Sequence, residues 1–471
     1  MMKKLLIIGF LCGSFFTNAE VKLSVIFTKG MVLQQNTEVA IWGKTAPNKK
    51  IKIVGSWNSE AITVKSNESG RFTAKLKTTK SGGPYNLTFD DGELKTISEV
   101  MLGEVFLCSG QSNMEQTVKN ALHPELEIQD ADYPKIHIFK IEKAESLSKV
   151  DDVKGNWTSV NPENVLLKGS IVFFLSRHLY KMLNVPIGVI HSSYGGTPQE
   201  AWLSEPYIQD VAEARTYLEN ARRNKVEDKN KSKVPTVLYN AMIEPIIPYT
   251  IKGVFWYQGE ANSTNNVTYP ILLSNFITSW RQAWGNSNLP FIIAQLAGYG
   301  LSEKRETPWV ETQNIQFSMS KKFSNVATVM AYDCGDEKNI HPTNKQEVAR
   351  RMFLAAQKLI YQQDILIQGP EVTEMGTKEN CIILTYNNVG AGLMSGNGET
   401  NIRCFLIAGT DKQYIEAKAE IIGENQVKVW SDSIKNPEQI MYASKSFNPI
   451  INLYNSEKLP AVPFKSERDI K

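Results

Sequence analysis

The stretch Val105-Phe-Leu-Cys-Ser-Gly-Gln-Ser-Asn-Met-Glu115 decides how this chain folds. The apolar run Val105–Leu107 predicts a buried strand. The run breaks at Gly110, and Met114–Leu122 is compatible with a helix. Ser112 therefore lies on a sharp turn between a strand and a helix, where the free N–H groups of a helix N-terminus point toward whatever its hydroxyl attacks.

A serine on such a turn suits a nucleophile whose attack generates an oxyanion. A serine that precedes a helix more often has the simpler role of capping that helix. The choice between the two roles depends on what the loops after the other strands carry.

The composition is that of a folded globular protein with more than one domain. The chain has 471 residues, of which 42% are hydrophobic and 21% charged, and it is longer than one core usually supports. Its 52 Lys and Arg residues against 49 Asp and Glu residues give a formal net charge of +3. This balance argues against nucleic acid and against an anionic membrane surface as partners.

Residues 1–19 have the pattern of a signal peptide. Lys3 and Lys4 precede the apolar run Leu5–Phe16, and Thr17-Asn-Ala19 offers a small-residue cleavage site. The run is too short to span a bilayer with margin, and no other segment approaches a transmembrane helix. We therefore expect a protein exported to the periplasm or secreted, without a membrane anchor; the sequence leaves its oligomeric state open.

The cysteines that remain after removal of the signal are too far apart for a disulfide framework, and they show no CxxC metal-binding spacing. Cys108 and Cys334 lie in or beside apolar strand-like segments, so we expect buried free thiols there. An exported protein could pair Cys381 with Cys404, but we do not favour that pairing.

Three regions with different patterns follow the signal. Residues 20–100 contain short strands separated by Gly, Pro and Asn turns, which indicates an N-terminal β-sandwich-like module. Residues 101–363 alternate apolar strands with amphipathic helices, which predicts a parallel sheet flanked by helices on both faces. Residues 364–471 return to the strand pattern and predict a C-terminal β module. The predicted fold class is thus α/β.

In such a sheet, catalytic groups collect on loops beyond the carboxyl ends of the strands. The strands expected in the central region are Val105–Leu107, Ile187–His191, Ile251–Tyr257, Phe291–Gln295 and Val326–Tyr332. The helices expected between and after them are Ile171–Leu183, Pro206–Asn224, Ile271–Trp284, Val310–Lys321 and Lys345–Tyr361.

Polar groups suited to acyl transfer follow several of these strands. The loop after the second strand contains Gly195 and Gly196, whose backbone can turn an N–H toward a ligand. The loop after the third contains Gln258 and Asn262, whose side-chain amides could serve as oxyanion donors. The loop after the fifth contains His341, a base that could take the proton of the serine. Each of these features is weak when taken alone.

The chain has only 5 histidines, so the base can be chosen by elimination. His178 falls in a helix pattern, His137 in a strand-like run, and His123 precedes a proline after the first helix. His191 lies on an apolar strand, where we expect a buried, hydrogen-bonded imidazole. His341 is the candidate that remains.

Four ordered sequence blocks carry more information together than any one of them does. They are Gly110-Gln-Ser-Asn-Met-Glu115, Gly195-Gly-Thr-Pro-Gln-Glu-Ala-Trp202, Trp256-Tyr-Gln-Gly-Glu-Ala-Asn262 and Ile340-His-Pro-x-x-Lys-Gln346. With their flanks, which cover nearly the whole mature chain, they resemble the sialate O-acetylesterase branch of the SGNH hydrolase superfamily. The resemblance implies an SGNH-hydrolase-like fold. It also implies release of acetate from O-acetylated sialic acids or sialoglycans, with the 9-O-acetyl group favoured, by Ser–His chemistry without metal or cofactor.

The resemblance assigns Ser112 as the nucleophile and His341 as the general base and acid. The oxyanion donors that it implies are the N–H of Ser112, a backbone N–H at Gly195 or Gly196, and a side-chain amide, for which Gln258 is favoured over Asn262.

One position departs from the superfamily pattern. The superfamily usually has an aspartate three residues before the catalytic histidine, and this chain has Lys338 there. Either Asp336, or with less support Asp333, orients His341, or a backbone carbonyl does so and the site is a Ser–His dyad.

Discrimination between substrates must come from the sugar, because an acetyl group needs only a small acyl pocket. Tyr194 and Trp202 could stack on a pyranose ring, and Gln111 and Glu260 are further candidate substrate contacts. An acetylated plant polysaccharide such as acetylxylan is the alternative substrate. A non-catalytic carbohydrate-binding protein is the less favoured third hypothesis.

Overall fold

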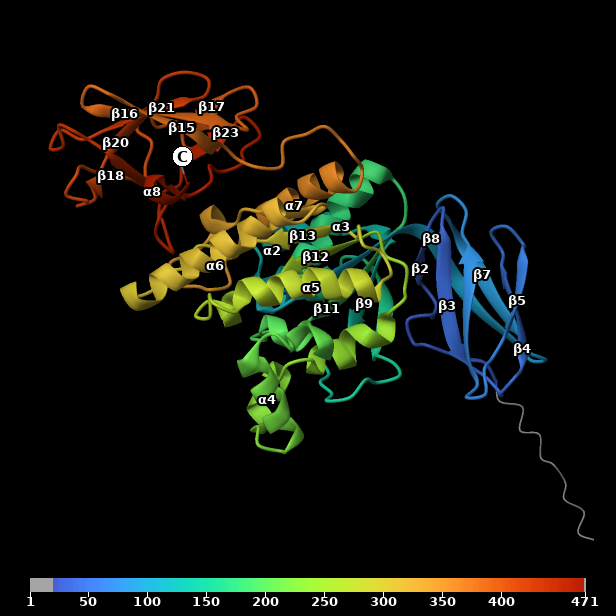
Figure 1. Ribbon diagram of the computed structural model, residues 1–471. Helices are drawn as coiled ribbons and strands as arrows, with labels where there is room; N and C mark the ends of the chain where they lie inside the picture. The colour runs from blue at the N-terminus through green and yellow to red at the C-terminus, as the bar shows by residue number, and fades with distance from the viewer. Residues whose placement is uncertain (1–19, 470–471) are drawn as a thin grey trace, which may run out of the picture.

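The computed structural model of the chain describes residues 20–469. The predicted signal peptide, residues 1–19, lies outside the described residues. Three parts follow one another along the molecule: an N-terminal β part, a central layered part and a C-terminal β part (Figure 1). Between residues 20 and 469, no helix is both long and apolar enough to cross a membrane.

The central sheet places its strands in the order β10-β9-β11-β8-β12-β13-β14. All neighbours from β9 to β14 are parallel, and β10 at the edge is antiparallel to β9. The strands are β8 (Leu94–Gly110), β9 (Tyr133–Ile141), β10 (Gly155–Val160), β11 (Ile187–Ser193), β12 (Gly253–Tyr257), β13 (Phe291–Ala294) and β14 (Val326–Val329).

The strand order reverses at β8, which has β11 on one side and β12 on the other. The chain first crosses from β8 to β9 and β11, and it then returns past β8 to β12, β13 and β14. In doubly wound sheets, ligands bind beyond the carboxyl ends of the strands at such a reversal. The topology therefore points to the loops after β8, β11 and β12.

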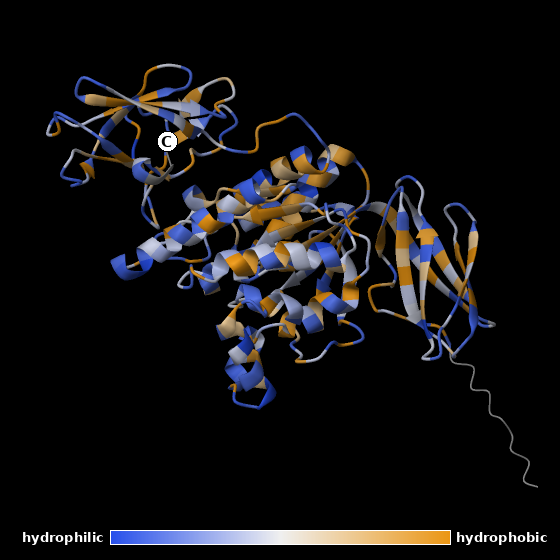
Figure 2. Ribbon diagram, viewed as in Figure 1, coloured by the Kyte–Doolittle hydropathy of each residue, from blue (hydrophilic) through white to orange (hydrophobic). Residues whose placement is uncertain are grey.

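Alternate residues of the central strands face opposite layers of helices, because side chains alternate along a strand. Val105 and Leu107 of β8 belong to the apolar core shared with α5 and α6, whereas Phe106 and Cys108 belong to the core shared with α3 and α7. Figure 2 shows the hydrophobic strands enclosed between these helices. The predicted α/β class, with helices on both faces of a parallel sheet, is confirmed.

The helices differ in length and in role. Those that cover the sheet are α3 (Ser170–Leu183), α5 (Tyr269–Ala283), α6 (Glu303–Lys322) and α7 (Lys345–Leu359). The shorter ones are α1 (Ser112–Glu115), α2 (Pro124–Gln129), α4 (Ala212–Arg222) and α8 (Ser466–Asp469).

The N-terminal β part is joined to the central sheet through a shared strand. The first half of β8 pairs antiparallel with β7, and its second half enters the central sheet. The strand therefore begins at Leu94, well before the expected Val105. The other strands of this part are β1 (Lys22–Leu23), β2 (Val32–Gln34), β3 (Glu38–Lys44), β4 (Lys50–Gly55), β5 (Ala61–Lys65), β6 (Arg71–Lys77) and β7 (Gly82–Asp90).

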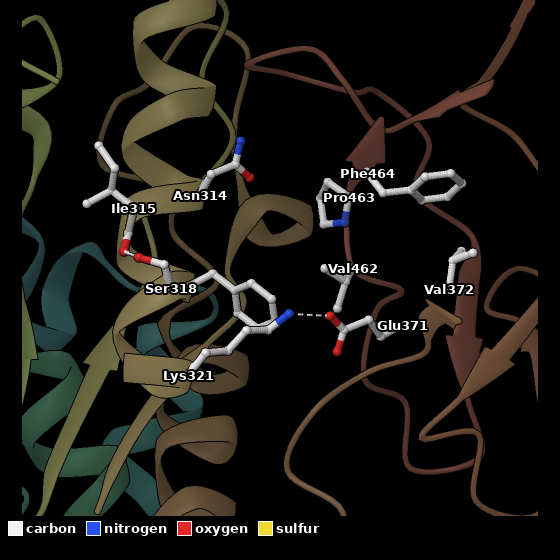
Figure 3. A pocket seen from close by; sticks show the side chains of 10 residues that line it. Asn314, Ile315, Ser318, Lys321, Glu371, Val372, Val462, Pro463 and Phe464 are labelled. Carbon is white, nitrogen blue, oxygen red and sulfur yellow. Dashed lines mark hydrogen bonds and ion pairs between the residues drawn. The ribbon is translucent and has the colours of Figure 1, made fainter. Parts of the chain in front are cut away.

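The C-terminal β part consists of antiparallel sheets around an apolar core that also includes Met330 and Tyr332 of the central part. A cavity of about 380 Å³ separates it from α6, and the ion pair between Lys321 Nζ and Glu371 Oε1 (2.5 Å) bridges that cavity (Figure 3). Its strands are β15 (Glu371–Lys378), β16 (Cys381–Asn387), β17 (Leu393–Ser395), β18 (Phe405–Ala408), β19 (Ile415–Glu416), β20 (Lys418–Ile421), β21 (Gln426–Trp430), β22 (Gln439–Tyr442), β23 (Leu453–Asn455) and β24 (Phe464–Lys465).

The helix expected at Met114–Leu122 is wrong in length. The helix α1 ends at Glu115, and a 3-10 turn follows at Val118–Asn120. Between them the backbone at Thr117 is extended and forms a bridge with Gly169, just before α3. This pairing interrupts a pattern that is helical by residue type alone.

The cysteines behave largely as their surroundings predict. Cys108 and Cys334 are buried free thiols, as expected. Cys381 and Cys404 are free as well, and each thiol lies 3.0 Å from a backbone carbonyl oxygen, so the pairing that we did not favour is absent between the described cysteines.

Candidate active site

Ser112 lies at the first position of α1, directly beyond the carboxyl end of β8. The turn requires a glycine, because Gly110 has a φ of 140° and a Cβ there would lie 2.1 Å from the carbonyl oxygen of Tyr257. Within residues 20–469, the backbone N–H of Ser112 has no hydrogen-bond partner, as expected at the start of a helix. The side chain of Ser112 is half-buried.

His341 reaches Ser112 from the loop between β14 and α7. Its Nε2 atom lies 2.9 Å from Oγ of Ser112, although the two residues are 229 positions apart. At this distance an imidazole can accept the hydroxyl proton of a serine. The sheet thus brings together the two residues on which the sequence prediction depended.

The electrostatic surroundings of His341 favour a neutral imidazole. Burial lowers the pKa of His341 below its usual value, the Lys345 ammonium lowers it further, and the Glu115 carboxylate acts in the opposite direction. A neutral imidazole is the form that accepts a proton, so His341 is in the state that a base requires near neutral pH.

Neither carboxylate considered for orienting His341 contacts its ring. Asp336 Oδ1 accepts the backbone N–H groups of Lys338 and Asn339, both at 2.8 Å, and thereby shapes the loop. Within residues 20–469, Nδ1 of His341 has no hydrogen-bond partner, neither a carboxylate nor a backbone carbonyl. These contacts correct the prediction that Asp336 orients His341 and leave the geometry of a Ser–His dyad.

Asp333 takes part in a separate buried network. It binds Arg351 of α7 through both carboxylate oxygens (2.6 and 2.7 Å) and accepts the hydroxyl of Tyr454 from β23 (3.0 Å). Burial alone would raise the pKa of Asp333, but the Arg351 guanidinium holds it below its usual value. The network ties the loop that leads to His341 to α7 and to the C-terminal β part.

The substitution Arg351→Met is expected to lower the free energy of unfolding by about 3–5 kcal/mol, because it leaves the Asp333 carboxylate buried without its partner. The two side chains are only 2% and 5% exposed. Urea unfolding followed by circular dichroism measures the change. The control Arg403→Met breaks an exposed pair and should cost less than about 1 kcal/mol. Equal losses in the two variants would contradict a structural role for the buried pair.

The paired glycines after β11 have different surroundings. The N–H of Gly195 donates to Glu115 Oε2 at 2.7 Å, which corrects the prediction that this N–H serves an oxyanion. Gly195 still approaches the nucleophile closely, since a Cβ on it would lie 3.3 Å from Cβ of Ser112. Gly196 has a φ of 75° and faces open space, and its N–H has no partner within residues 20–469. Gly196 is therefore the glycine whose N–H is available.

The predicted side-chain amides are used inside the protein. Gln258 is fully buried, and its Nε2 donates to Asn262 Oδ1 (2.7 Å) and to the carbonyl oxygen of Thr197 (3.3 Å). Asn262 Nδ2 donates to Glu200 Oε2 at 3.0 Å. These bonds hold the loops after β11 and β12 together and occupy both amide N–H groups of Gln258, which argues against Gln258 as an oxyanion donor. The same role for Asn262 stays a prediction.

The predicted substrate contacts Gln111 and Glu260 differ in their free groups. The Oε1 atom of Gln111 accepts the N–H groups of Gly259 (3.4 Å) and Ala261 (3.3 Å), while its Nε2 has no partner within residues 20–469. Glu260 is partly exposed as a residue, but its Oε2 is buried and its Oε1 accepts from Asn113 Nδ2 at 2.5 Å. Gln111 thus retains a donor for a ligand, whereas Glu260 belongs to the protein interior.

Of the two predicted aromatic contacts, only Tyr194 is accessible. Trp202 is 0% exposed and packs against Trp256, which corrects the prediction that it stacks on a sugar. Tyr194 is half-buried, and the ammonium of Lys143 lies 4.8 Å from the centre of its ring. Lys143 also pairs with Glu115 Oε1 at 2.5 Å, so this cation lies next to the Gly195 loop.

Four residues that the sequence analysis did not single out surround the Ser–His pair. Asn113, Glu115 and Lys345 stand inside the quoted sequence blocks, so the blocks themselves carried a signal for them. Lys143 follows β9, which the sequence analysis noted only as a strand-like run at His137 and did not count among the strands of the central sheet. The rule that functional groups follow strand ends would have found Lys143 there.

The fold and the Ser–His pair beyond the carboxyl end of its sheet define an esterase of the SGNH-like class. The chain matches, over residues 102–359, the family described as carbohydrate esterase, sialic acid-specific acetylesterase. It belongs to this family, and it is therefore a carboxylic ester hydrolase that acts on carbohydrate esters.

Individual relatives agree with this assignment. The sialate O-acetylesterase of Rattus norvegicus is 30% identical over 418 residues, which is 76% of this chain and 77% of the relative. The enzyme of the same name from Mus musculus is 28% identical over 434 residues, 79% of this chain and 80% of the relative. The crystal structure of a novel carbohydrate acetylesterase from Xanthomonas citri superposes with a TM-score of 0.84 at 29% identity, covering 94% of this chain and 99% of that one.

Proposed function

We propose that this protein hydrolyses acetyl esters on sialic acids, with the 9-O-acetyl group preferred, and that Ser112 and His341 carry out the reaction. The observation that carries the proposal is the 2.9 Å contact between Ser112 Oγ and His341 Nε2. The family membership and the relatives named sialate O-acetylesterase support the substrate class.

In the first step, Ser112 Oγ attacks the acetyl carbonyl carbon while His341 Nε2 accepts the hydroxyl proton. The carbonyl oxygen becomes an oxyanion. For its donors we assign the backbone N–H groups of Ser112 and Gly196, which have no other partner in the described part of the chain. The intermediate then expels the sugar oxygen, which takes the proton from His341, and the acetyl group remains on Ser112.

In the second step, His341 takes a proton from water, and the resulting hydroxide attacks the acetyl carbon on Ser112. The bond to Oγ breaks, Oγ recovers its proton from His341, and acetic acid leaves and ionises to acetate in solvent. Both steps use the same neutral imidazole and return it unchanged.

Recognition of the sugar is assigned to three groups near the nucleophile: Lys143 is exposed, Tyr194 is half-buried, and Gln111 is buried but keeps a free amide nitrogen within residues 20–469. The ring of Tyr194 can pack against a pyranose or its glycerol side chain. The Nε2 amide of Gln111 can donate to a substrate oxygen. Lys143 offers positive charge to the sialic acid carboxylate, although Glu115 partly offsets that charge.

Acetate release from a panel of matched sugars tests the substrate. The panel contains 9-O-acetyl and 4-O-acetyl sialic acid, an O-acetylated sialoglycan and acetylxylan, each also incubated with the Ser112→Ala variant as background. We expect kcat/KM to be highest for the 9-O-acetyl sugar. Activity on acetylxylan alone would instead support the alternative of a plant-polysaccharide acetylesterase. Release that the Ser112→Ala variant matches would overturn the proposed mechanism.

A further inference from the structure

A chain of buried polar groups lies directly beneath the Ser–His pair. The ammonium of Lys345, at the start of α7, donates to Asn113 Oδ1 at 2.5 Å. The amide nitrogen of Asn113 donates in turn to Glu260 Oε1 (2.5 Å) and to the carbonyl oxygen of Ile340 (3.1 Å). Asn113 and Lys345 are 1% and 2% exposed, so water does not compete for these bonds.

Lys345 determines which way the Asn113 amide faces. An ammonium group has donors and no acceptor, so the amide oxygen must point toward Lys345. The two amide N–H groups then point toward Oε1 of Glu260 and the Ile340 carbonyl oxygen, which accept them. The oxygen and both N–H groups of the Asn113 amide thus each have a complementary partner, and a single orientation of Asn113 satisfies all three.

The bond from Asn113 to Ile340 joins the two halves of the site. Asn113 directly follows Ser112, Ile340 directly precedes His341, and the two bonded residues are 227 positions apart. His341 lacks a partner at Nδ1 within residues 20–469, so no bond at that atom fixes its ring. The Asn113 amide is thus a direct link between the nucleophile turn and the histidine loop.

We propose that Asn113 and Lys345 are positioning residues: the Lys345 ammonium fixes the Asn113 amide, and this amide holds the backbone before His341 at the distance that Ser112 requires. The inference rests on the proposed function, because it assumes that Ser112 and His341 react. In this chain, the hydrogen bond from Asn113 to the Ile340 carbonyl takes the place of a carboxylate that orients the histidine ring.

The charge of Lys345 adds a second, electrostatic consequence. The charged groups that influence His341 are Lys345 from α7 and Glu115 from α1. Each has a charged neighbour of opposite sign: Glu260 lies across Asn113 from Lys345, and Lys143 pairs with Glu115. Burial lowers the pKa of Lys345 to about 8, with Glu260 acting in the opposite direction, so the group is still largely cationic at pH 7. This cation disfavours protonation of His341 and keeps the base neutral at lower pH.

The substitution Lys345→Met tests both consequences on a chromogenic acetyl ester, which needs the Ser–His pair and no sugar contacts. We expect kcat to fall about 10- to 100-fold with KM changed less than about threefold, because the ester still binds while the base is misplaced. Removing the cation raises the pKa of His341, so the acidic limb of the kcat profile should move to higher pH. The control Lys338→Met changes an exposed lysine of the same loop and should leave both quantities unchanged.

A second variant keeps the test decisive if Lys345→Met folds poorly. Asn113→Asp retains an oxygen for Lys345 but removes the N–H groups that reach Ile340 and Glu260. It should lower kcat by a similar factor. Thermal unfolding reports whether the variant is folded. Folded variants with wild-type kcat and an unmoved acidic limb would overturn the inference. A wild-type protein that hydrolyses no acetyl ester would instead overturn the proposed function.

Discussion

Replacing Ser112 with alanine is expected to lower kcat for acetyl ester hydrolysis by about 10⁴-fold or more, the scale seen when a nucleophilic serine is removed from a comparable site. Without Oγ no acyl-enzyme forms, and the oxyanion donors and the bound substrate supply only the residual rate. Acetate release under saturating substrate measures the loss. The fold should be unaffected, because the Ser112 side chain is half-buried and, within residues 20–469, hydrogen-bonds only to His341.

A second serine–histidine pair in the same sheet provides a matched control. Ser193 Oγ lies 2.8 Å from Nε2 of His191, and both side chains are buried. Burial lowers the pKa of His191 to about 3, and His191 and Ser193 are only 1% and 6% exposed. Ser193→Ala should therefore keep turnover within a few-fold of the wild type. If Ser193→Ala lost activity and Ser112→Ala kept it, the reaction would take place at Ser193 and His191, and the assignment of Ser112 as the nucleophile would be wrong.

The substitution His341→Ala is expected to cost nearly as much in kcat as loss of the nucleophile, again about 10⁴-fold or more, because the serine hydroxyl then has no base. The double variant Ser112→Ala/His341→Ala should be scarcely worse than either single variant. Such strong non-additivity is the sign of two groups that act as a unit. Single-turnover acetate release on the three variants provides the comparison.

His191→Ala should have the opposite profile. The imidazole of His191 fills a buried position against Gly169, so its removal leaves a cavity and should lower the free energy of unfolding by about 2–4 kcal/mol while folded protein remains active. The two histidine variants thus separate catalysis from packing. If His341→Ala kept its activity and His191→Ala lost it at full folding, the assignment of the base would be wrong.

The sequence was sufficient to predict the layered sheet and the meeting of Ser112 with His341. Strand periodicity identifies which residues follow strand ends, and parallel strands bring those ends to one edge. The expected buried, hydrogen-bonded imidazole of His191 is also confirmed by its contact with Ser193. These features depend on residue type and spacing, which the sequence displays directly.

Hydrogen-bond partners could not be predicted in the same way. An amide such as Gln258 and a carboxylate such as Asp336 can each bond to several neighbours, and the choice depends on side-chain positions fixed by packing. Gln258 is occupied by Asn262, and Asp336 by the backbone of its own loop. A residue of the right chemical type, close to the right strand end, therefore need not face the reacting atoms.

The bond from Tyr454 to Asp333 has a consequence for how this enzyme can vary. Tyr332 reinforces it, since its hydroxyl donates to the carbonyl oxygen of Ala461 at 2.6 Å. Through these bonds the C-terminal strands set the path of the polypeptide that leads to His341. Substitutions or deletions in these strands would alter turnover without changing any group that contacts the substrate. Selection for activity, as well as for stability, would therefore favour keeping this β part together with the catalytic sheet.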